Sequence, residues 1–204
     1  PAVLRTEGRE SINKNGSRIK YGMTDGYFLS LSRLWKGKGV DIAVKACDKL
    51  GLPLKVVGSG PELKNLKSLP CRQAGQISNR KNIEFLGQIA DEELPGFYAG
   101  AKALIVAAED EDFGITAVEA QACGTPVIAL KSGGYLETVL ENKTGEFFEK
   151  GDGPEETVEN LVKVLEKFDH GKYRAEDCLK NAKKFGKVRF KEQILGLIEK
   201  HFQS

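Results

Sequence analysis

The strongest constraint on the fold is a repeated pattern: a short apolar run, a turn, and then a segment with helical periodicity. One of these runs, Ala103 to Ala108, is apolar on consecutive residues rather than on alternate ones. Consecutive apolar residues are typical of strands covered on both faces, as in a parallel sheet flanked by helices. Six such runs occur, namely YFLSLS, LKVVG, IEFLG, ALIVAA, PVIAL and GEFF, starting at residues 27, 54, 83, 103, 126 and 145.

We therefore predict an α/β fold: a Rossmann-like, doubly wound parallel sheet of about six strands, with helices on both faces and a helical C-terminal tail. The tail is predicted because no strand pattern follows Phe148. Two apolar stripes with helical spacing occur there instead, and we expect both to pack in the core. The first stripe consists of Val158, Leu161, Val162, Leu165 and Phe168, and the second of Phe190, Ile194, Leu197 and Ile198.

The first part of the chain lacks this pattern. Residues 1–26 are polar, contain Asn-Gly and Asp-Gly pairs, and show no sustained period. Because such composition is typical of loops, we interpret residues 1–26 as a linker or lead-in segment and residues 27–204 as a single domain.

Composition excludes several classes of function. The net charge is only +2, from 31 basic and 29 acidic residues, whereas nucleic-acid-binding domains usually carry a basic excess. The four cysteines form no Cys-x-x-Cys pair and there are only two histidines, so we expect neither a zinc site nor a disulfide framework. The chain begins without a secretory leader pattern, and no apolar run approaches the roughly 20 residues of a membrane span. We therefore expect a reducing, cytoplasmic location.

The segment from Glu109 to Ala129, EDEDFGITAVEAQACGTPVIA, is the most informative for function. It follows an apolar strand, and its Phe113-Gly114-Ile115 sequence falls at the strand-to-helix turn, where doubly wound folds bind ligands. Gly114 allows a ligand to approach the backbone closely. The free N–H groups of the first helical turn, about residues 113–116, suit a diphosphate.

Two glutamates of this segment are candidates for sugar contacts. Glu119 follows Glu111 by eight residues, so both carboxylates can face one crevice at a separation of roughly 10 Å. A glycosidase pair would need its carboxyl groups about 5 to 9.5 Å apart across one bond. The longer spacing fits two hydroxyl-rich sugars at opposite ends of a diphosphate better.

With its Phe-Gly and Gly-x-Pro context, this segment resembles the E-x7-E signature of family 4 (group 1) retaining glycosyltransferases, which have the two-domain GT-B architecture. The resemblance implies that Glu111 binds hydroxyls of the transferred hexose and that Glu119 binds the ribose of the nucleotide. Phe113, Gly114 and Ile115 are then substrate-binding candidates. The resemblance covers about residues 27–202, which correspond to the C-terminal, donor-binding half of the family.

A second segment, Ser32 to Asp41, follows the first strand and resembles the family motif Gly/Ser-Arg-Leu-x-x-x-Lys-Gly-x-Asp. Arg33 offers a planar fork of donors and Lys38 a point charge, and both match a diphosphate leaving group. Charge on that group rises as the glycosidic bond breaks, so the pair should help most in the transition state. We take Arg33, Lys38 and Glu111 as the catalytic candidates.

Three weaker segments follow other strands. Gly58 and Gly60 form a Gly-x-Gly turn that in the family lies near the donor, but the turn lacks the third glycine of a dinucleotide fingerprint. The segment NIEFLGQI resembles the family's nucleobase-contacting loop and nominates Gly87 and Ile89. The stretch from Ser132 to Val139 resembles the family's Gly-Gly-x-x-Glu-x-Val motif, which we interpret as a tight turn into a helix.

We expect no metal and no other cofactor. Asp110-Glu111-Asp112 has the Asp-x-Asp pattern that holds a divalent ion in the other large glycosyltransferase architecture. The triplet overlaps the E-x7-E segment, however, and Arg33 and Lys38 already supply positive charge for the diphosphate.

The resemblance implies retaining hexosyl transfer from a nucleotide diphosphate sugar to a glycan or lipid-linked acceptor. The sequences EDFGIT and GGYLETV are similar to those of surface-polysaccharide mannosyltransferases, which indicates that the donor is GDP-mannose. Two alternatives remain: a UDP-sugar-dependent enzyme of the same family, and a non-catalytic nucleotide-sugar-binding module. The acceptor-binding N-terminal domain is absent from the sequence, so we expect it in a longer parent or a partner chain, and we expect the isolated domain to be inactive or nearly so. Peripheral contact with the cytosolic face of a membrane would be made through the parent enzyme.

Overall fold

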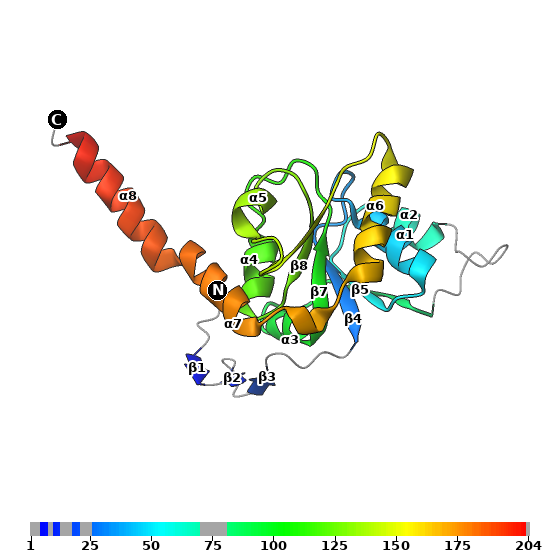
Figure 1. Cartoon of the computed structure of the whole chain (residues 1–204), viewed down its shortest axis with the longest axis horizontal. Coiled ribbons are helices and arrows are strands. Elements are labelled where there is room, and N and C mark those ends of the chain that lie inside the picture. The colour runs from blue at the N-terminus through cyan, green and yellow to red at the C-terminus, as the bar shows by residue number, and fades with distance from the viewer. Residues whose placement is uncertain (1–4, 8–9, 13–17, 21–25, 70–80, 203–204) are drawn as a thin grey trace.

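The computed structural model describes residues 5–7, 10–12, 18–20, 26–69 and 81–202 (Figure 1). Its main feature is a sheet of six parallel strands in the order β6-β5-β4-β7-β8-β9. The strands are β4 (Tyr27–Leu31), β5 (Leu54–Val57), β6 (Ile83–Gly87), β7 (Ala101–Val106), β8 (Val127–Leu130) and β9 (Gly145–Phe148). Counted from β4, this order is 3-2-1-4-5-6, that of the Rossmann fold. The predicted fold class is confirmed, and each of the six apolar runs forms a strand.

Helices cover both faces of the sheet (Figure 1). One face packs against α1 (Val40–Leu50), α2 (Leu63–Ser68) and α6 (Pro154–Lys167), and the other against α3 (Leu94–Gly100), α4 (Ile115–Ala122) and the short α5 (Tyr135–Thr138). Neighbouring residues of one strand enter opposite layers: Ile105 lies in the first and Leu104 in the second, and both are fully buried. This two-sided burial is why the runs are apolar on consecutive residues.

The tail follows α6 and continues through η1 (His170–Lys172), α7 (Ala175–Ala182), η2 (Lys183–Phe185) and α8 (Lys187–Phe202). The first predicted stripe lies on α6, where Val158, Leu161, Val162 and Leu165 are buried and Phe168 packs against the same cluster, so that prediction is confirmed. Segment α7 packs against α4.

The prediction for the second stripe is wrong. Helix α8 runs away from the body of the domain (Figure 1). Phe190, Ile194, Leu197 and Ile198 are 41 to 64% exposed. A helical stripe shows that a helix has an apolar side but not what covers it, and no layer of the described domain extends far enough to reach α8.

The segment interpreted as a linker contains three short strands, β1 (Arg5–Glu7), β2 (Glu10–Ile12) and β3 (Arg18–Lys20), which pair antiparallel in a separate small sheet. Strand β3 lies near α3. The main sheet begins at Tyr27.

Candidate functional site

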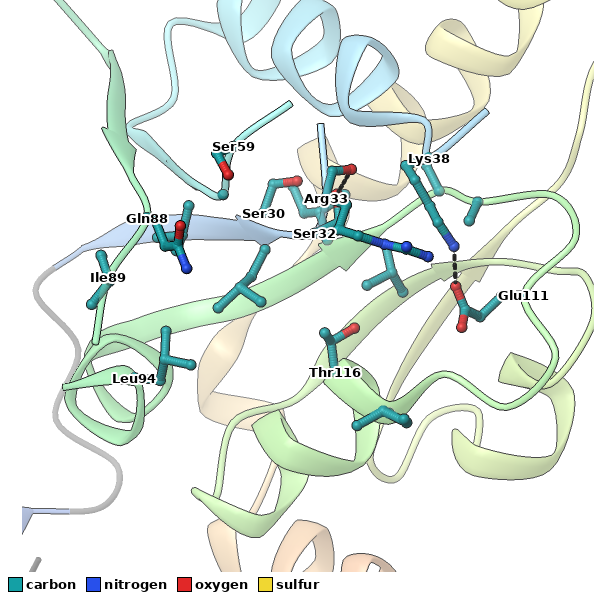
Figure 2. Close-up of a pocket in the computed structure, with 18 of the residues that line it drawn as sticks. Ser30, Ser32, Arg33, Lys38, Ser59, Gln88, Ile89, Leu94, Glu111 and Thr116 are labelled. Atoms are coloured by element: carbon teal, nitrogen blue, oxygen red, sulfur yellow. Dashed lines mark hydrogen bonds and ion pairs between the residues drawn. The ribbon is translucent and has the colours of Figure 1, made fainter. Parts of the chain in front are cut away.

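A cavity of about 470 Å³ opens at the carboxyl ends of β4, β5, β6 and β7 (Figure 2). Strands β4 and β7 are neighbours in the sheet, and the connections that leave them run in opposite directions along it. This is the topological switch point, where open α/β sheets place their ligands. Arg33 and Lys38 reach the cavity from the loop after β4, and Glu111 reaches it from the loop after β7.

Lys38 and Glu111 form an ion pair within this cavity. Lys38 Nζ lies 2.9 Å from Glu111 Oε2, although the two residues are 73 positions apart in the sequence. Both side chains are about one quarter exposed, so solvent screens the pair only in part. Arg33 points toward the same end of the cavity (Figure 2). Two cations and one carboxylate therefore meet at one end of a single cavity.

Glycine explains how the Lys38 loop comes so close to β7. Gly39 precedes α1 with a φ of 66°, in the left-handed region. A Cβ at this position would lie 2.2 Å from the carbonyl oxygen of Ala107, at the end of β7. Only glycine permits both the conformation and the approach. The close contact brings Lys38 within reach of Glu111.

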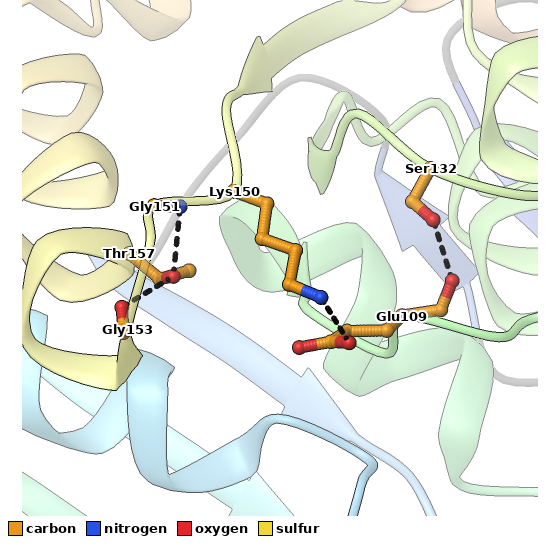
Figure 3. Close-up of polar contacts among 6 residues, drawn as sticks. All are labelled: Glu109, Ser132, Lys150, Gly151, Gly153 and Thr157. Atoms are coloured by element: carbon orange, nitrogen blue, oxygen red, sulfur yellow. Dashed lines mark hydrogen bonds and ion pairs between the residues drawn. The ribbon is translucent and has the colours of Figure 1, made fainter.

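The loops after the next two strands hold the Glu111 loop in place. The Gly134 N–H donates to the carbonyl of Glu111 at 2.7 Å, and the Ser132 hydroxyl donates to the carbonyl of Glu109 at 2.5 Å. Figure 3 shows the latter contact together with the Lys150 ammonium, which lies 2.7 Å from the Glu109 carboxylate. The Gly-Gly stretch is thus a tight turn into α5, as predicted, and it contacts the Glu111 backbone.

Helix α4 directs its N-terminus toward the cavity. The N–H groups of Ala117 and Val118 donate to the Gly114 carbonyl, whereas those of Ile115 and Thr116 make no backbone hydrogen bond among the described residues. Ile115 and Thr116 both line the cavity. Free N–H groups and the helix dipole together favour an anion at this end of a helix.

Comparison with known proteins shows the family of this chain. Residues 13–185 match the model of the family described as Glycosyl transferases group 1. The chain belongs to this family. The predicted membership of group 1 is thereby confirmed, and the matched range ends at η2, just before α8.

Two curated relatives and one solved structure illustrate the likeness. An uncharacterised glycosyltransferase of Methanocaldococcus jannaschii is 30% identical over 72% of this chain and 40% of its own length. The GDP-mannose-dependent alpha-(1-6)-phosphatidylinositol monomannoside mannosyltransferase of Mycolicibacterium smegmatis is 36% identical over 63% of this chain and 36% of its own. Anabaena HepE in complex with UDP is 26% identical, with a TM-score of 0.67 over 86% of this chain and 49% of that one. The chain thus spans less than half the length of each.

In this member of the family, the residues nominated from sequence divide into two sets. Those that line the cavity are Arg33, Lys38, Gly58, Ile89, Glu111 and Ile115. Those outside its lining are Gly60, Gly87, Phe113, Gly114 and Glu119. Gly114 nevertheless begins α4 with a φ of 81°, and Phe113 packs edge-on against Phe185, with ring centroids 5.5 Å apart.

Glu119 is held by a tyrosine that sequence reasoning did not single out. The hydroxyl of Tyr98, on α3, donates to Glu119 Oε2 at 2.9 Å. Burial, and then the Glu119 carboxylate, raise the pKa of Tyr98 well above its usual value. The phenol therefore stays protonated and fixes the orientation of Glu119, whose side chain is otherwise exposed.

Gly58 and Gly60 act in packing between loops. A Cβ on Gly58 would lie 1.9 Å from the Ser32 carbonyl oxygen, and one on Gly60 would lie 2.3 Å from that of Leu34. The Gly58 N–H also donates to the Gly87 carbonyl at 2.8 Å. These glycines let the loops after β4, β5 and β6 pack directly on one another, which shapes the wall of the cavity.

Several lining residues were not nominated from sequence: Ser30, Ser59, Gln88, Asp91, Leu94 and Tyr135. Ser59, Gln88 and Asp91 lie in the loops just after the carboxyl ends of β5 and β6, so the switch-point rule applied to those strands would have found them. Ser30 lies within β4, and Leu94 and Tyr135 reach the cavity from α3 and α5. Burial, and then Glu111, raise the pKa of Tyr135, so its hydroxyl remains a donor.

Among the described residues, no group of three or more His, Cys, Asp or Glu side chains could hold a metal ion. Asp110 and Asp112 are exposed on the Glu111 loop. The three cysteines in the described ranges, Cys47, Cys123 and Cys178, are buried and free, whereas Cys71 lies outside those ranges. No helix in the described part of this family member combines the length and the apolarity needed to cross a membrane.

Proposed function

We propose that this chain binds the donor of a retaining hexosyltransferase, a nucleotide diphosphate sugar, and that the donor is GDP-mannose. One observation carries the proposal: Arg33, Lys38, Glu111 and the free N–H groups of α4 converge on one cavity. Two cations and a helix N-terminus suit a diphosphate. A carboxylate beside them suits sugar hydroxyls.

The proposed reaction follows from where charge develops. As the bond from sugar to diphosphate breaks, negative charge grows on the leaving phosphate, and Arg33 and Lys38 stabilise it there. Glu111 binds the hexose, and Glu119, oriented by Tyr98, binds the ribose. Because the curated relatives are more than twice as long as their matched parts, we propose that transfer requires an acceptor-binding domain from a longer parent or a partner chain, while this chain alone binds donor and turns over little.

Residues at the two ends of the cavity support a direction for the donor. Lys38 and Glu111 lie at one end, and Gln88, Ile89 and Leu94 at the other (Figure 2). With the diphosphate sugar at the charged end, the nucleobase occupies the end formed by the loop after β6. Asp91 lines the cavity in this loop.

Asp91 bears on the choice of base. Guanine presents two adjacent N–H donors, on N1 and N2, and a carboxylate accepts both. Uracil presents a single N–H between two carbonyl oxygens, and the negative carboxylate repels both of these oxygens. Together with the GDP-mannose dependence named for the Mycolicibacterium relative, this chemistry favours GDP over UDP.

Replacing Asp91 tests the choice of base. Asp91→Asn is expected to weaken GDP binding about tenfold, since hydrogen bonds to charged groups contribute roughly 1.5–3 kcal/mol and Asp91 is exposed. UDP binding should stay the same or improve. Glu92→Gln, at the next exposed acidic residue and outside the cavity lining, is the matched control for titration calorimetry. Equal loss of both nucleotides, or no loss of GDP affinity, would contradict the assignment.

Titration calorimetry of the intact chain tests donor binding itself. We expect GDP and GDP-mannose to bind with a Kd in the millimolar range or tighter, because Arg33, Lys38 and the N-terminus of α4, which suit a diphosphate, all lie on this chain. EDTA should leave the affinity unchanged. Absence of binding by a folded chain would reject the proposal, and loss of binding in EDTA would reject its metal-independent form.

A UDP-sugar donor is the second candidate. It is favoured by the likeness to Anabaena HepE, whose structure holds UDP. Tighter binding of UDP than of GDP in the same titration would select it. The third candidate, a non-catalytic nucleotide-sugar-binding module, is disfavoured by Glu111, because a protein that binds only the nucleotide needs no carboxylate at the sugar end.

A further inference from the structure

The tail of the domain contacts the donor-site loop directly. Phe185, in η2, packs edge-on against Phe113, with ring centroids 5.5 Å apart and an interplanar angle of 76°. Phe113 lies between Glu111 and Gly114, so it belongs to the short stretch that connects Glu111, the candidate sugar-binding residue, to the start of α4. Edge-to-face pairs of this kind hold their rings in a preferred geometry.

A buried polar cluster links the same two parts of the fold. Asn181 Nδ2, on α7, donates to Gln121 Oε1 at 2.7 Å and to the Thr138 carbonyl at 2.9 Å. Gln121 Nε2, on α4, donates to the same carbonyl at 2.8 Å. All three residues are at most 2% exposed, so each hydrogen bond is costly to lose. Thr138 in turn donates its hydroxyl to the Gly134 carbonyl at 3.0 Å, and Gly134 supports the Glu111 backbone.

Two independent contacts therefore join the α7–η2 segment to the donor site. Asn181 fixes the body of α4 and the end of α5, while Phe185 fixes the loop in front of α4. Neither residue lines the cavity. The segment leads straight into α8, which leaves the domain (Figure 1).

We propose that Asn181 and Phe185 are positioning residues of the donor site: they set the place of the Glu111 loop and of the α4 N-terminus. The donor-affinity part of this inference rests on the proposed function, but the structural part does not. If the loop is released from Phe185, it occupies its binding-competent position only part of the time. The apparent affinity for the donor then falls in proportion to the fraction of molecules whose loop is in the binding-competent position.

Phe185→Ala is the test, carried out on the whole chain. We expect nucleotide affinity to fall about threefold to tenfold in titrations with GDP, at a temperature where the variant is fully folded. We also expect faster hydrogen exchange at the amides of Ala117 and Val118, which bond to the Gly114 carbonyl. The amide of Ile42, which bonds to Gly39 at the start of α1, should exchange at the wild-type rate.

Two further variants separate positioning from general loss of stability. Phe185→Tyr keeps the aromatic ring, so GDP affinity and amide exchange should both stay at their wild-type values. If Phe185 only filled space, Phe185→Leu would preserve both readouts equally well. Phe190→Ala removes a phenyl group from α8, where that side chain is 64% exposed, and should change neither readout. Unchanged exchange at Ala117 and Val118 in Phe185→Ala would overturn the inference. Hydrogen exchange is measured without ligand. This outcome can therefore be distinguished from failure of the proposed function, in which the wild-type chain would bind no nucleotide.

Discussion

Lys38→Ala is expected to lower kcat/KM about 10²-fold or more in the full-length transferase that we propose. Removal of one preorganised donor to developing charge typically has an effect of this size. Within the present chain, the same change should weaken binding of GDP. It also leaves the Glu111 carboxylate without its 2.9 Å partner, so the cavity becomes more negative and repels the diphosphate.

The chain offers a close control for this experiment. Lys36 lies in the same loop and is exposed, but it does not line the cavity. Lys36→Ala removes an equal charge and should retain near-normal turnover and affinity. If Lys38→Ala also retained near-normal turnover, the proposed role of Lys38 would be refuted. If both variants lost activity equally, the effect would come from net charge rather than from position.

Gly134→Ala is the second change with a large expected effect. Gly134 has ordinary helical angles, with φ −62° and ψ −13°, so the change introduces no backbone strain. The new Cβ, however, would lie 2.5 Å from the carbonyl oxygen of Asp112 and 2.5 Å from the Cα of Phe113. The Glu111 loop must move to accept it. A displacement of about 1 Å in a supporting loop can reduce turnover about 10²-fold, and overpacking costs about 1–3 kcal/mol of stability.

Gly96→Ala serves as the control for Gly134→Ala. Gly96 lies exposed in α3, and a Cβ there would meet nothing within 4 Å. Alanine should stabilise this helix by up to about 1 kcal/mol and leave donor binding unchanged. Thermal unfolding and nucleotide titration of the two variants give the comparison. Wild-type affinity in Gly134→Ala would show that the loop after β8 does not position Glu111.

The fold was predictable because its signal is local. Each strand of the parallel sheet is buried on both faces, so runs such as Ala103 to Ala108 are apolar on consecutive residues. The helices of the main layers can be predicted from the helical spacing of their apolar residues, as α6 can. Helix α8 shows the limit of that signal. Its stripe has the same helical period as that of α6, but periodicity gives no information on the partner, and the stripe is exposed.

The site was predictable only in part. The family motifs nominated Arg33, Lys38 and Glu111, and all three line the cavity. Their pairing depends on the adjacency of β4 and β7 and on the contact of Gly39 with Ala107, which no local pattern encodes. The contacts of Tyr98 and Phe185 are non-local in the same way. The family resemblance nominates Phe113 as a substrate-binding residue but gives no indication that its ring packs on Phe185.

The order of the strands also has a consequence for how the chain folds. The cavity draws its walls from loops after four strands, and its charged end requires β4 to pair with β7, although β5 and β6 lie between them in the sequence. Parallel pairing across such long connections forms slowly, because the loop-closure entropy is lost before the contacts are gained. The cavity thus appears only with the completed central sheet. A ligand that binds there stabilises the native state alone, so its concentration sets the fraction of chains that escape unfolding and proteolysis.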